Sequence, residues 1–249
     1  MLDQIRIVLV RTIRAGNIGS SVRAMMNMGL SDIVLVAPAA HRFETQALGF
    51  AARAKPLLDT ARDVPTIADA LEGCVATFAT SGKGGPHRRE AAVPPALAGD
   101  LAIEAIAAGG RVAIAFGPED RGLLQEEILQ FDRIIEIPSN PDYPALNLAA
   151  AVTVVSYEMR QAWLRHQALP PLPAQDPRAE DGHKRIVCEK LFDALELIGF
   201  FRQQQDPNHL RYAIRRVLGR ADLSVNEADI FIGMAQQIMW HARNRRPEP

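Results

Sequence analysis

The amino-acid sequence predicts an α/β fold: a mostly parallel sheet with helices on both faces, followed by a small all-α domain. The first observation is a series of short apolar runs, each followed by a longer segment compatible with a helix, as is typical of parallel sheets. The second is that this alternation stops near residue 165, after which only helical periodicity remains. The predicted strands are residues 5–10, 33–36, 75–79, 112–116 and 134–137.

Two of these elements have especially clear signals. Residues 5–10, Ile-Arg-Ile-Val-Leu-Val, form the nearly continuous apolar run of a strand that is buried on both faces. The long helix predicted at 146–165 opens with Leu-Asn-Leu-Ala-Ala-Ala-Val-Thr-Val-Val, which is too apolar for a helix that faces solvent. We therefore expect this helix to pack against the sheet or against a second subunit.

A domain boundary is predicted at 166–183, where four prolines stand among polar residues, a composition typical of an extended linker. Helices are predicted beyond it at 184–200, 207–220 and 225–243, the last after a capping-box spacing of Ser224 and Glu227. The predicted units are an α/β domain at 1–165, the linker at 166–183 and a helical extension at 184–249.

The composition limits the possible functions. The 249 residues are 48% hydrophobic, and 28 basic residues balance 29 acidic ones, so any surface for nucleic acid must be local. Cys74 and Cys188 have no CxxC partner, which excludes a disulfide framework and a zinc knuckle and indicates a reducing compartment. No apolar run reaches membrane length and no cleavable leader is visible, so we expect a cytoplasmic protein without a membrane partner.

Three unusual loops each stand between a predicted strand and the helix after it. The first, at 14–25, contains Arg-Ala-Gly-Asn-Ile-Gly-Ser-Ser, whose backbone N–H groups at a helix start suit a phosphate or another anion, with Arg23 about one turn inside the helix. The alternative is a plain turn with a solvated arginine. The second loop, at 116–123, holds Glu119 and Asp120 in a rigid Gly-Pro turn that can accept hydrogen bonds. Its alternative is a tight turn whose carboxylates favour the next helix dipole.

The third loop, at 137–148, has three prolines within seven residues, which leaves backbone groups for another partner to satisfy. A bound ligand is a candidate for that partner. Because ligands of open parallel sheets gather at the carboxyl ends of strands, the three loops together predict one site.

Other chemical motifs are missing or incomplete. The glycine-rich stretch at 81–85 lacks the GK[ST] ending of a phosphate loop, and no GxGxxG follows a strand. The sequence has neither an HExxH spacing nor a GxSxG elbow, so we expect no metal centre and no serine hydrolase.

Taken in order and spacing, the three loops resemble the SpoU/TrmH class of the SPOUT superfamily of RNA 2'-O-methyltransferases. The first motif is Gly-Asn-Ile-Gly-Ser-Ser-Val-Arg-Ala-Met at 16–25 followed by Met-Gly-Leu at 28–30, the second is 116–123, and the third is 137–149. The resemblance covers nearly the whole chain and extends to the helical tail, which is similar to that of tRNA-modifying members.

The resemblance implies a C-terminal trefoil knot in the α/β domain, a homodimer with active sites at the subunit interface, and S-adenosylmethionine as cofactor. The implied cofactor pocket consists of Thr80, Ser81, Gly82, Gly117, Ile137, Pro144, Ala145 and Leu146. The methyl group would be directed at Arg23 and Asn17, the implied catalytic residues. Glu119, Ser139 and Asn147 match positions around the pocket and its RNA-facing rim.

The chain departs from the family pattern at two places. Ala145 stands where serine is frequent, and Pro-Glu-Asp at 118–120 differs from the Arg-Glu-Arg of some members. Both departures leave cofactor binding intact and put the nucleotide preference in doubt.

The implied activity is 2'-O-methylation of a tRNA ribose, at cytidine or uridine in anticodon-loop position 32. One alternative is a sibling enzyme that acts on rRNA, on another tRNA site or on a base atom. Another is an RNA-binding scaffold without turnover.

Arginines in the helical tail predict an RNA surface there. Residues 202–220 carry five arginines against Asp206, and Arg211, Arg215 and Arg216 are the predicted phosphate contacts. Arg6, Arg11, Arg14 and Arg23 would continue this basic track on the α/β domain. The alternative is a solvated helix face.

Overall fold

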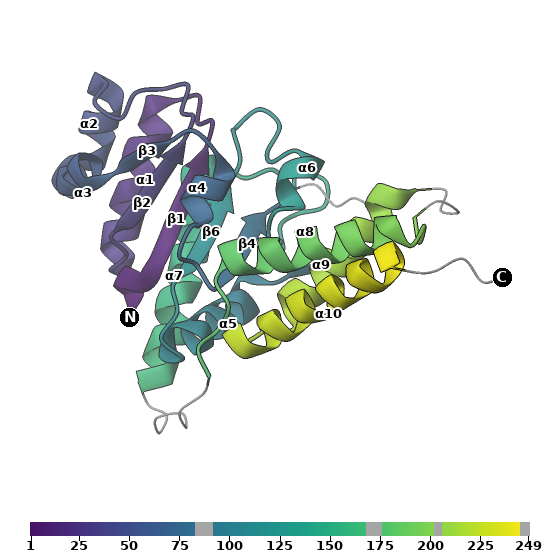
Figure 1. The fold of residues 1–249 in the computed structure, drawn as a ribbon. Coiled ribbons are helices and arrows are strands. Elements are labelled where there is room, and N and C mark those ends of the chain that lie inside the picture. The colour runs from purple at the N-terminus through teal and green to yellow at the C-terminus, as the bar shows by residue number, and fades with distance from the viewer. Residues whose placement is uncertain (83–91, 168–175, 202–205, 245–249) are drawn as a thin grey trace.

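The computed structural model describes residues 1–82, 92–167, 176–201 and 206–244. Within these ranges, the chain forms a seven-stranded parallel sheet flanked by helices, with three further helices packed beside it (Figure 1). The strands are β1 (Ile5–Val10), β2 (Asp32–Val36), β3 (Arg62–Val64), β4 (Ala76–Thr80), β5 (Ala92–Val93), β6 (Val112–Phe116) and β7 (Arg133–Ile135). The helices are α1 (Ala15–Met28), α2 (Thr45–Ala51), α3 (Lys55–Thr60), α4 (Ile67–Leu71), α5 (Pro95–Ala107), α6 (Gln125–Ile128), α7 (Leu148–Gln167), α8 (Asp181–Leu197), α9 (Pro207–Arg220) and α10 (Val225–Asn244), with short 3-10 turns η1 (Leu2–Gln4) and η2 (Ala52–Ala54).

The strand order is β3-β2-β1-β6-β4-β7-β5, and every paired strand runs parallel to its neighbour. The predicted α/β class with a parallel sheet is therefore confirmed. Each of the five predicted apolar runs is a strand, within two residues at either end. The sequence analysis missed β3 and β5, which are the two edges of the sheet. An edge strand of two or three residues can be polar on its open side, so it leaves no apolar run to detect.

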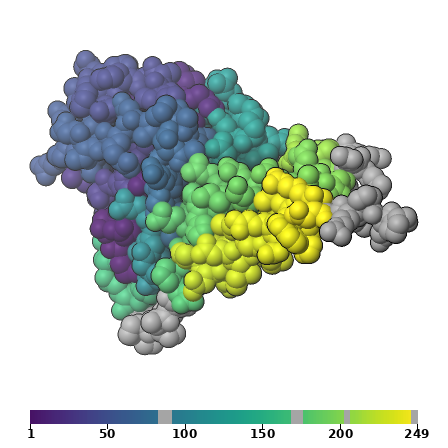
Figure 2. Space-filling model, in the orientation of Figure 1, coloured from purple at the N-terminus to yellow at the C-terminus, as the bar shows by residue number. Residues whose placement is uncertain are grey.

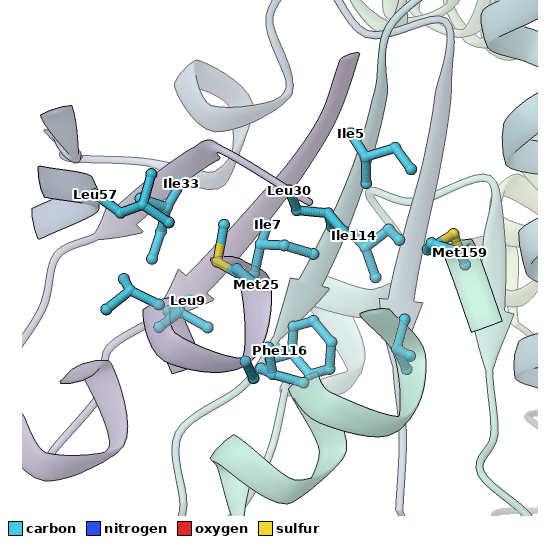
Figure 3. Close-up of a cluster of buried hydrophobic side chains, with 14 of the residues drawn as sticks. Ile5, Ile7, Leu9, Met25, Leu30, Ile33, Leu57, Ile114, Phe116 and Met159 are labelled. Atoms are coloured by element: carbon cyan, nitrogen blue, oxygen red, sulfur yellow. The ribbon is translucent and has the colours of Figure 1, made fainter. Parts of the chain in front are cut away.

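Helices cover both faces of the sheet because the strands are apolar on both faces. Ile5, Ile7 and Leu9 point to one face, where they share a core with Met25 of α1 and Met159 of α7 (Figure 3). Residues of the opposite parity, such as Val8 and Val10, belong to a second core with side chains from α4 and α6. The sheet is thus buried between two apolar layers, and its carboxyl edge is left for the loops.

The long apolar helix is α7, which packs against α1 and α5 on the first face. It begins two residues later than predicted, at Leu148. The side chain of Asn147 sets this start, because its Oδ1 accepts hydrogen bonds from the backbone N–H of Ala149 at 2.9 Å and of Ala150 at 3.4 Å.

The C-terminal helices form as predicted, and α10 opens with the expected capping box. The N–H of Glu227 donates to Ser224 Oγ at 3.2 Å, and the N–H of Ser224 donates to Glu227 Oε2 at 2.8 Å. The prediction of an extended linker over 166–183 is wrong at both ends. Residues 166–167 belong to α7 and 181–183 to α8, and Asp181 is fully buried. Residues 168–175 of that segment lie outside the described residues.

The helical extension is fastened to the sheet by buried polar contacts. The N–H of Asp181 donates to the carbonyl of Cys74 at 2.6 Å, just before β4. Lys184 Nζ donates to the carbonyl of Val75 at 3.0 Å and to Asp132 Oδ2 at 2.5 Å, just before β7. Figure 2 shows the atoms of α8 and α10, green to yellow, lying directly against the α/β unit.

Three more ion pairs strengthen this junction. Arg133 of β7 donates to both carboxylate oxygens of Asp222, at 3.0 and 3.2 Å. Arg178 pairs with Asp222 and with Glu104 of α5. The extension therefore holds a fixed orientation relative to the sheet.

Candidate active site

The three loops that the sequence singled out come together at the carboxyl edge of the sheet, where the second and third line one pocket and the first is hydrogen-bonded to both. The second loop follows β6, the third follows β7, and the residues after β4 complete the wall. The pocket wall includes every residue of the implied cofactor set: Thr80, Ser81, Gly82, Gly117, Ile137, Pro144, Ala145 and Leu146. It also includes Glu119 and, beyond the predicted set, Asp120, Arg121 and Leu123.

Two glycines shape this pocket in different ways. A Cβ on Gly117 would lie 2.2 Å from the backbone N of Leu123, so the second loop can fold back on itself only if that position is glycine. A Cβ on Gly82 would lie 3.8 Å from the carbonyl oxygen of Pro144 and 4.0 Å from Ala145 Cα. A Cβ at this position would therefore make only ordinary van der Waals contact, and the loop after β4 lies close to the third loop in the pocket wall.

Glu119 fastens the second loop to the first. Its carboxylate accepts hydrogen bonds from the backbone N–H groups of Ile13 at 2.9 Å and Arg14 at 3.1 Å. It also accepts one from Asn17 Nδ2 at 2.7 Å. These donors lie at the start of α1, so the carboxylate binds the positive end of that helix and fixes the orientation of Asn17. The alternative, in which Glu119 favours the dipole of the helix after its own loop, is wrong for this residue, because its carboxylate binds the start of α1 and α6 begins only at Gln125.

Asn17 continues this chain of hydrogen bonds to the third loop. Its Oδ1 accepts from Asn147 Nδ2 at 3.1 Å, while Asn147 Oδ1 caps α7. Within the third loop, Ser139 Oγ donates to the carbonyl of Pro144 at 2.9 Å. One hydrogen-bonded series thus joins Glu119, Asn17 and Asn147, one residue from each loop, as the prediction of a single site requires.

Replacing Glu119 by Gln is expected to loosen this series and to weaken ligand binding in the pocket about tenfold or more. The amide cannot accept all the N–H donors of the carboxylate and loses the charge that faces the helix start, which together are worth about 1.5–3 kcal/mol. Isothermal titration calorimetry with S-adenosylmethionine, the cofactor that the family resemblance implies, measures the change in affinity. Glu126→Gln, at an exposed glutamate of α6, is the matched control. Equal affinities for the two variants would contradict the role of Glu119.

A second contact that holds the second loop, the ion pair between Arg11 and Glu127, was not predicted from the sequence. Arg11 pairs in a bidentate manner with Glu127 of α6, with one bond of 2.8 Å from Nη2 to Oε2. Glu127 Oε2 also accepts from the N–H of Leu124 at 2.8 Å. The second loop is therefore held at Glu119 and again where it enters α6. An arginine and a glutamate so far apart in the chain give no local pattern, so only the fold reveals the pair.

The Arg11–Glu127 pair predicts a pH dependence of stability. Burial alone would raise the pKa of Glu127, but hydrogen bonds from Arg11 and from the Leu124 N–H outweigh it and leave this pKa below its usual 4.5. The pair's contribution is therefore present above pH 4.5 and lost as the pH falls through the lowered value. Urea denaturation should show Glu127→Gln less stable than the unchanged protein at pH 7, and the difference should shrink below pH 4.5. A difference that is constant with pH would contradict the pairing, and Glu126→Gln is again the control.

The basic track predicted on the α/β domain is only partly present. Arg6 is 4% exposed and binds Asp32 and the carbonyls of Ala70 and Glu72, so the prediction of a surface role for Arg6 is wrong. The positive charge of Arg6 is compensated by Asp32, and that of Arg11 by Glu127. Arg14 and Arg23 are exposed. Arg23 lies on α1 six residues beyond Asn17, about 9 Å along the helix, and the described pocket of its own chain does not include it.

The predicted arginines of the extension have different environments. Arg215 Nη2 donates to the carbonyl of Gln130 at 2.5 Å and to the buried Asp181 at 3.2 Å, so this side chain joins α9 to the segment before β7. Arg211 pairs with Glu196 and lies over the ring of Phe201, and Arg216 lies over the ring of Tyr212. Arg202 lies outside the described residues.

A metal-based site finds no support in the described ranges, where no three His, Cys, Asp or Glu side chains are grouped to hold an ion. The two cysteines are buried, and burial raises the pKa of the Cys74 thiol to about 11. In the same ranges, no helix combines the length and apolar character needed to cross a bilayer.

An open parallel sheet whose carboxyl edge carries three interlocked loops beside one pocket is an arrangement suited to binding a small ligand. The sequence model of the SpoU rRNA Methylase family matches residues 4–157. The chain belongs to this family.

Known proteins similar to this chain include one from Pseudomonas aeruginosa, described as tRNA (cytidine/uridine/adenosine-2'-O-)-methyltransferase TrmJ. It is 37% identical over 98% of this chain and 96% of its own length. Among solved structures, TrmJ from Z. mobilis ZM4 matches with a TM-score of 0.78 and 29% identity, covering 94% of this chain and 98% of that one. The AdoMet complex of the SpoU methyltransferase AviRb from Streptomyces viridochromogenes is 20% identical, covers 65% of this chain and 58% of that one, and shares the fold with a TM-score of 0.51.

Proposed function

We propose that this protein transfers a methyl group from S-adenosylmethionine to the 2'-hydroxyl of a tRNA ribose. One observation carries the proposal: the pocket wall and Asn17, drawn from three distant loops, form a single hydrogen-bonded unit at the carboxyl edge of the sheet. The pocket wall combines apolar side chains such as Ile137 and Leu146 with a few polar residues such as Thr80 and Ser81, which suits an adenosyl group. The close P. aeruginosa relative, with its stated tRNA 2'-O-methyltransferase activity, supports the substrate class.

The cofactor supplies a methyl group on a sulfonium, which is already an excellent leaving group. The protein therefore has to align the ribose hydroxyl and to manage its proton. Alignment of two reactants can contribute roughly 7–11 kcal/mol. Asn17, held by Glu119 and Asn147, has one fixed orientation and is suited to position the ribose.

Arg23 is proposed to stabilise the alkoxide that develops on the ribose 2'-oxygen. A guanidinium stays protonated in proteins, so it is a poor base and a good electrostatic partner. An adjacent RNA phosphate can take the proton. Because Arg23 lies outside the pocket of its own chain, we place the active site between two copies, with Arg23 of one copy facing the pocket of the other.

Two further features belong to this proposal. The third loop and α7 are proposed to pass through the loop after β6 as a C-terminal trefoil knot, which agrees with residues 144–146 sharing the pocket with 117–123. The proposed target is cytidine or uridine at anticodon-loop position 32, where an unpaired ribose is accessible. Ser139 is proposed to support the rim. The proposed cofactor contacts are Thr80, Ser81, Gly82, Gly117, Ile137, Pro144, Ala145 and Leu146.

The test is incubation of the purified protein with methyl-labelled S-adenosylmethionine and unmodified total tRNA, followed by digestion and mass spectrometry of the nucleosides. Label in 2'-O-methylcytidine or 2'-O-methyluridine at one anticodon-loop site is the expected result. Label in adenosine would widen the base preference, and label in rRNA alone would assign a sibling activity. Absence of label from both RNAs, with the cofactor bound, would leave an RNA-binding scaffold.

Removal of the C-terminal arginines tests whether α9 contacts RNA phosphates. Arg211→Ala with Arg216→Ala should weaken tRNA binding and reduce the slope of log affinity against log salt by roughly one or two. Filter binding between 50 and 200 mM salt measures the slope. We expect Arg215→Ala to act through lost packing, because its guanidinium is already bound inside the protein. An unchanged slope in the double variant would contradict a phosphate role for α9.

A further inference from the structure

We propose that Phe50, with the exposed cations Arg53 and Lys55 just after it and Arg14 and Arg23 at the adjoining helix α1, forms a stacking platform for an unpaired base of the substrate RNA. We call Phe50, Arg14, Arg23, Arg53 and Lys55 together the Phe50 surface. This inference rests on the proposed function, because it assigns a second contact to the same RNA. It differs from the basic track of Arg6, Arg11, Arg14 and Arg23, because that track includes no residue of α2 and no aromatic residue.

The ring of Phe50 is the centre of this surface. Phe50 is 55% exposed at the end of α2, although it is a large apolar side chain. Its ring lies flush against the backbone of α1, because a Cβ on Gly16 would come within 2.8 Å of a ring carbon. Glycine at position 16 therefore makes room for the ring, and the next residue is Asn17. The ring's fixed position and its open outer part are what a stacking partner needs.

The ring of Phe50 packs on the face of α1 that also carries Arg23. Gly16 and Arg23 are seven residues apart in α1, close to two full turns, so they share a face about 10 Å apart along the axis. An RNA ribose that reaches Arg23 of one copy therefore has a neighbouring nucleotide within range of the Phe50 ring of that same copy.

The cationic side chains of the Phe50 surface are open to solvent. Arg14, Arg23, Arg53 and Lys55 are exposed, and in the part of the chain that the structure describes none of them pairs with a carboxylate. Nearby arginines behave differently: Arg42 pairs with Asp63 across the β2–β3 side of the sheet. Arg53 and Lys55 follow Phe50 directly because the chain turns sharply at Ala52, where φ is +50°.

The charge and shape of this surface favour a single-stranded nucleic acid over a protein partner. Unpaired bases stack on aromatic rings while cations hold the flanking phosphates, and one base stacked on one ring contributes enough to be measured. A protein partner would need a wider apolar area than one ring, and four uncompensated cations would oppose most such contacts. The surface lies on the β3 side of the sheet, whereas α8 to α10 lie toward β7, so it is separate from the arginines of α9 (Figure 1).

Variants of Phe50 test the platform. Phe50→Leu keeps an apolar side chain of similar length but has no ring, and should weaken tRNA binding about 5- to 100-fold. Phe50→Trp should bind tRNA at least as well as the unchanged protein. The fluorescence of the new indole should be quenched when tRNA is added, beyond the change seen in the unchanged protein. The affinity for S-adenosylmethionine, measured by titration calorimetry, should be the same in all three proteins.

Three results would overturn the platform. The first is equal tRNA affinity for Phe50→Leu and the unchanged protein. The second is a tryptophan at position 50 that reports no quenching while tRNA is bound. The third is a change of oligomeric state in Phe50→Leu by sedimentation with unchanged tRNA affinity, which would assign the ring to a contact between copies.

The failure of the proposed function would look different. If the unchanged protein methylates rRNA in place of tRNA, the same variants are compared on an rRNA fragment, and a loss of affinity in Phe50→Leu there supports the platform. If the unchanged protein binds neither RNA, both the proposed function and the platform are wrong.

Discussion

Replacing Arg23 by alanine is expected to lower kcat about 10²- to 10³-fold while the affinity for S-adenosylmethionine stays the same. The reason is that Arg23 is proposed to act on charge that exists only in the transition state, and loss of one such donor typically has an effect of this size. Arg23 is exposed and outside the pocket of its own chain, so its loss should not disturb the fold or the pocket wall. Single-turnover methylation of tRNA and calorimetry with the cofactor measure the two quantities.

Arg23→Lys tests whether catalysis needs the planar guanidinium of Arg23 or only its positive charge. A rate near normal would show that a positive charge suffices and that the planar guanidinium is not required. A loss as large as that of Arg23→Ala would show that guanidinium geometry is needed. The control is Arg165→Ala, at an exposed arginine of α7 that pairs with the surface carboxylate of Asp100. A full rate for Arg23→Ala would remove Arg23 from the mechanism.

Replacing Lys184 by methionine is expected to lower the free energy of unfolding by about 3–5 kcal/mol. Lys184 and Asp132 are both almost completely buried, 4% and 2% exposed, and their side chains are 2.5 Å apart. Removal of one partner leaves the other as an uncompensated buried charge, which is the costly case for a buried ion pair. Asp132 would keep only its hydrogen bond from the N–H of Thr77.

The paired replacement Asp132→Asn with Lys184→Met should recover much of this loss, because no charge then stays buried without a partner. Urea denaturation followed by circular dichroism measures all variants. Arg165→Met, which breaks the exposed pair with Asp100, should cost less than about 1 kcal/mol. A loss below 1 kcal/mol for Lys184→Met would mean that water reaches the junction.

Local sequence patterns predicted the central strands and the place of the pocket for a common physical reason. A strand buried on both faces must be apolar along its length, so Ile5–Val10 is visible in the sequence, and the loop after such a strand is thereby placed at the carboxyl edge. Proline and glycine then mark which of these loops are irregular. All eight proposed cofactor contacts lie in one pocket because parallel strands bring their ends together.

Contacts between distant residues could not be predicted in this way. Arg6, Arg11 and Arg215 look alike in a sequence, yet each pairs with a different carboxylate in the fold, of Asp32, Glu127 and Asp181 respectively. The buried junction at Lys184 follows a proline-rich stretch that predicts an extended linker, and nothing local shows that the helix after it packs onto the sheet. The proposed knot and the proposed dimer have no local pattern in the sequence and rest on the family resemblance.

The docking of the extension has a consequence for exchanging parts among relatives. The extension contacts the segment just before β4 and the segment from Gln130 to Arg133, and both belong to the α/β unit. A chimera that receives another protein's tail would therefore leave Asp132 and Arg133 facing side chains that did not evolve with them. A graft that keeps both specificity and solubility would have to carry residues 130–133 along with the tail. The unit that can be exchanged between relatives therefore includes part of the sheet.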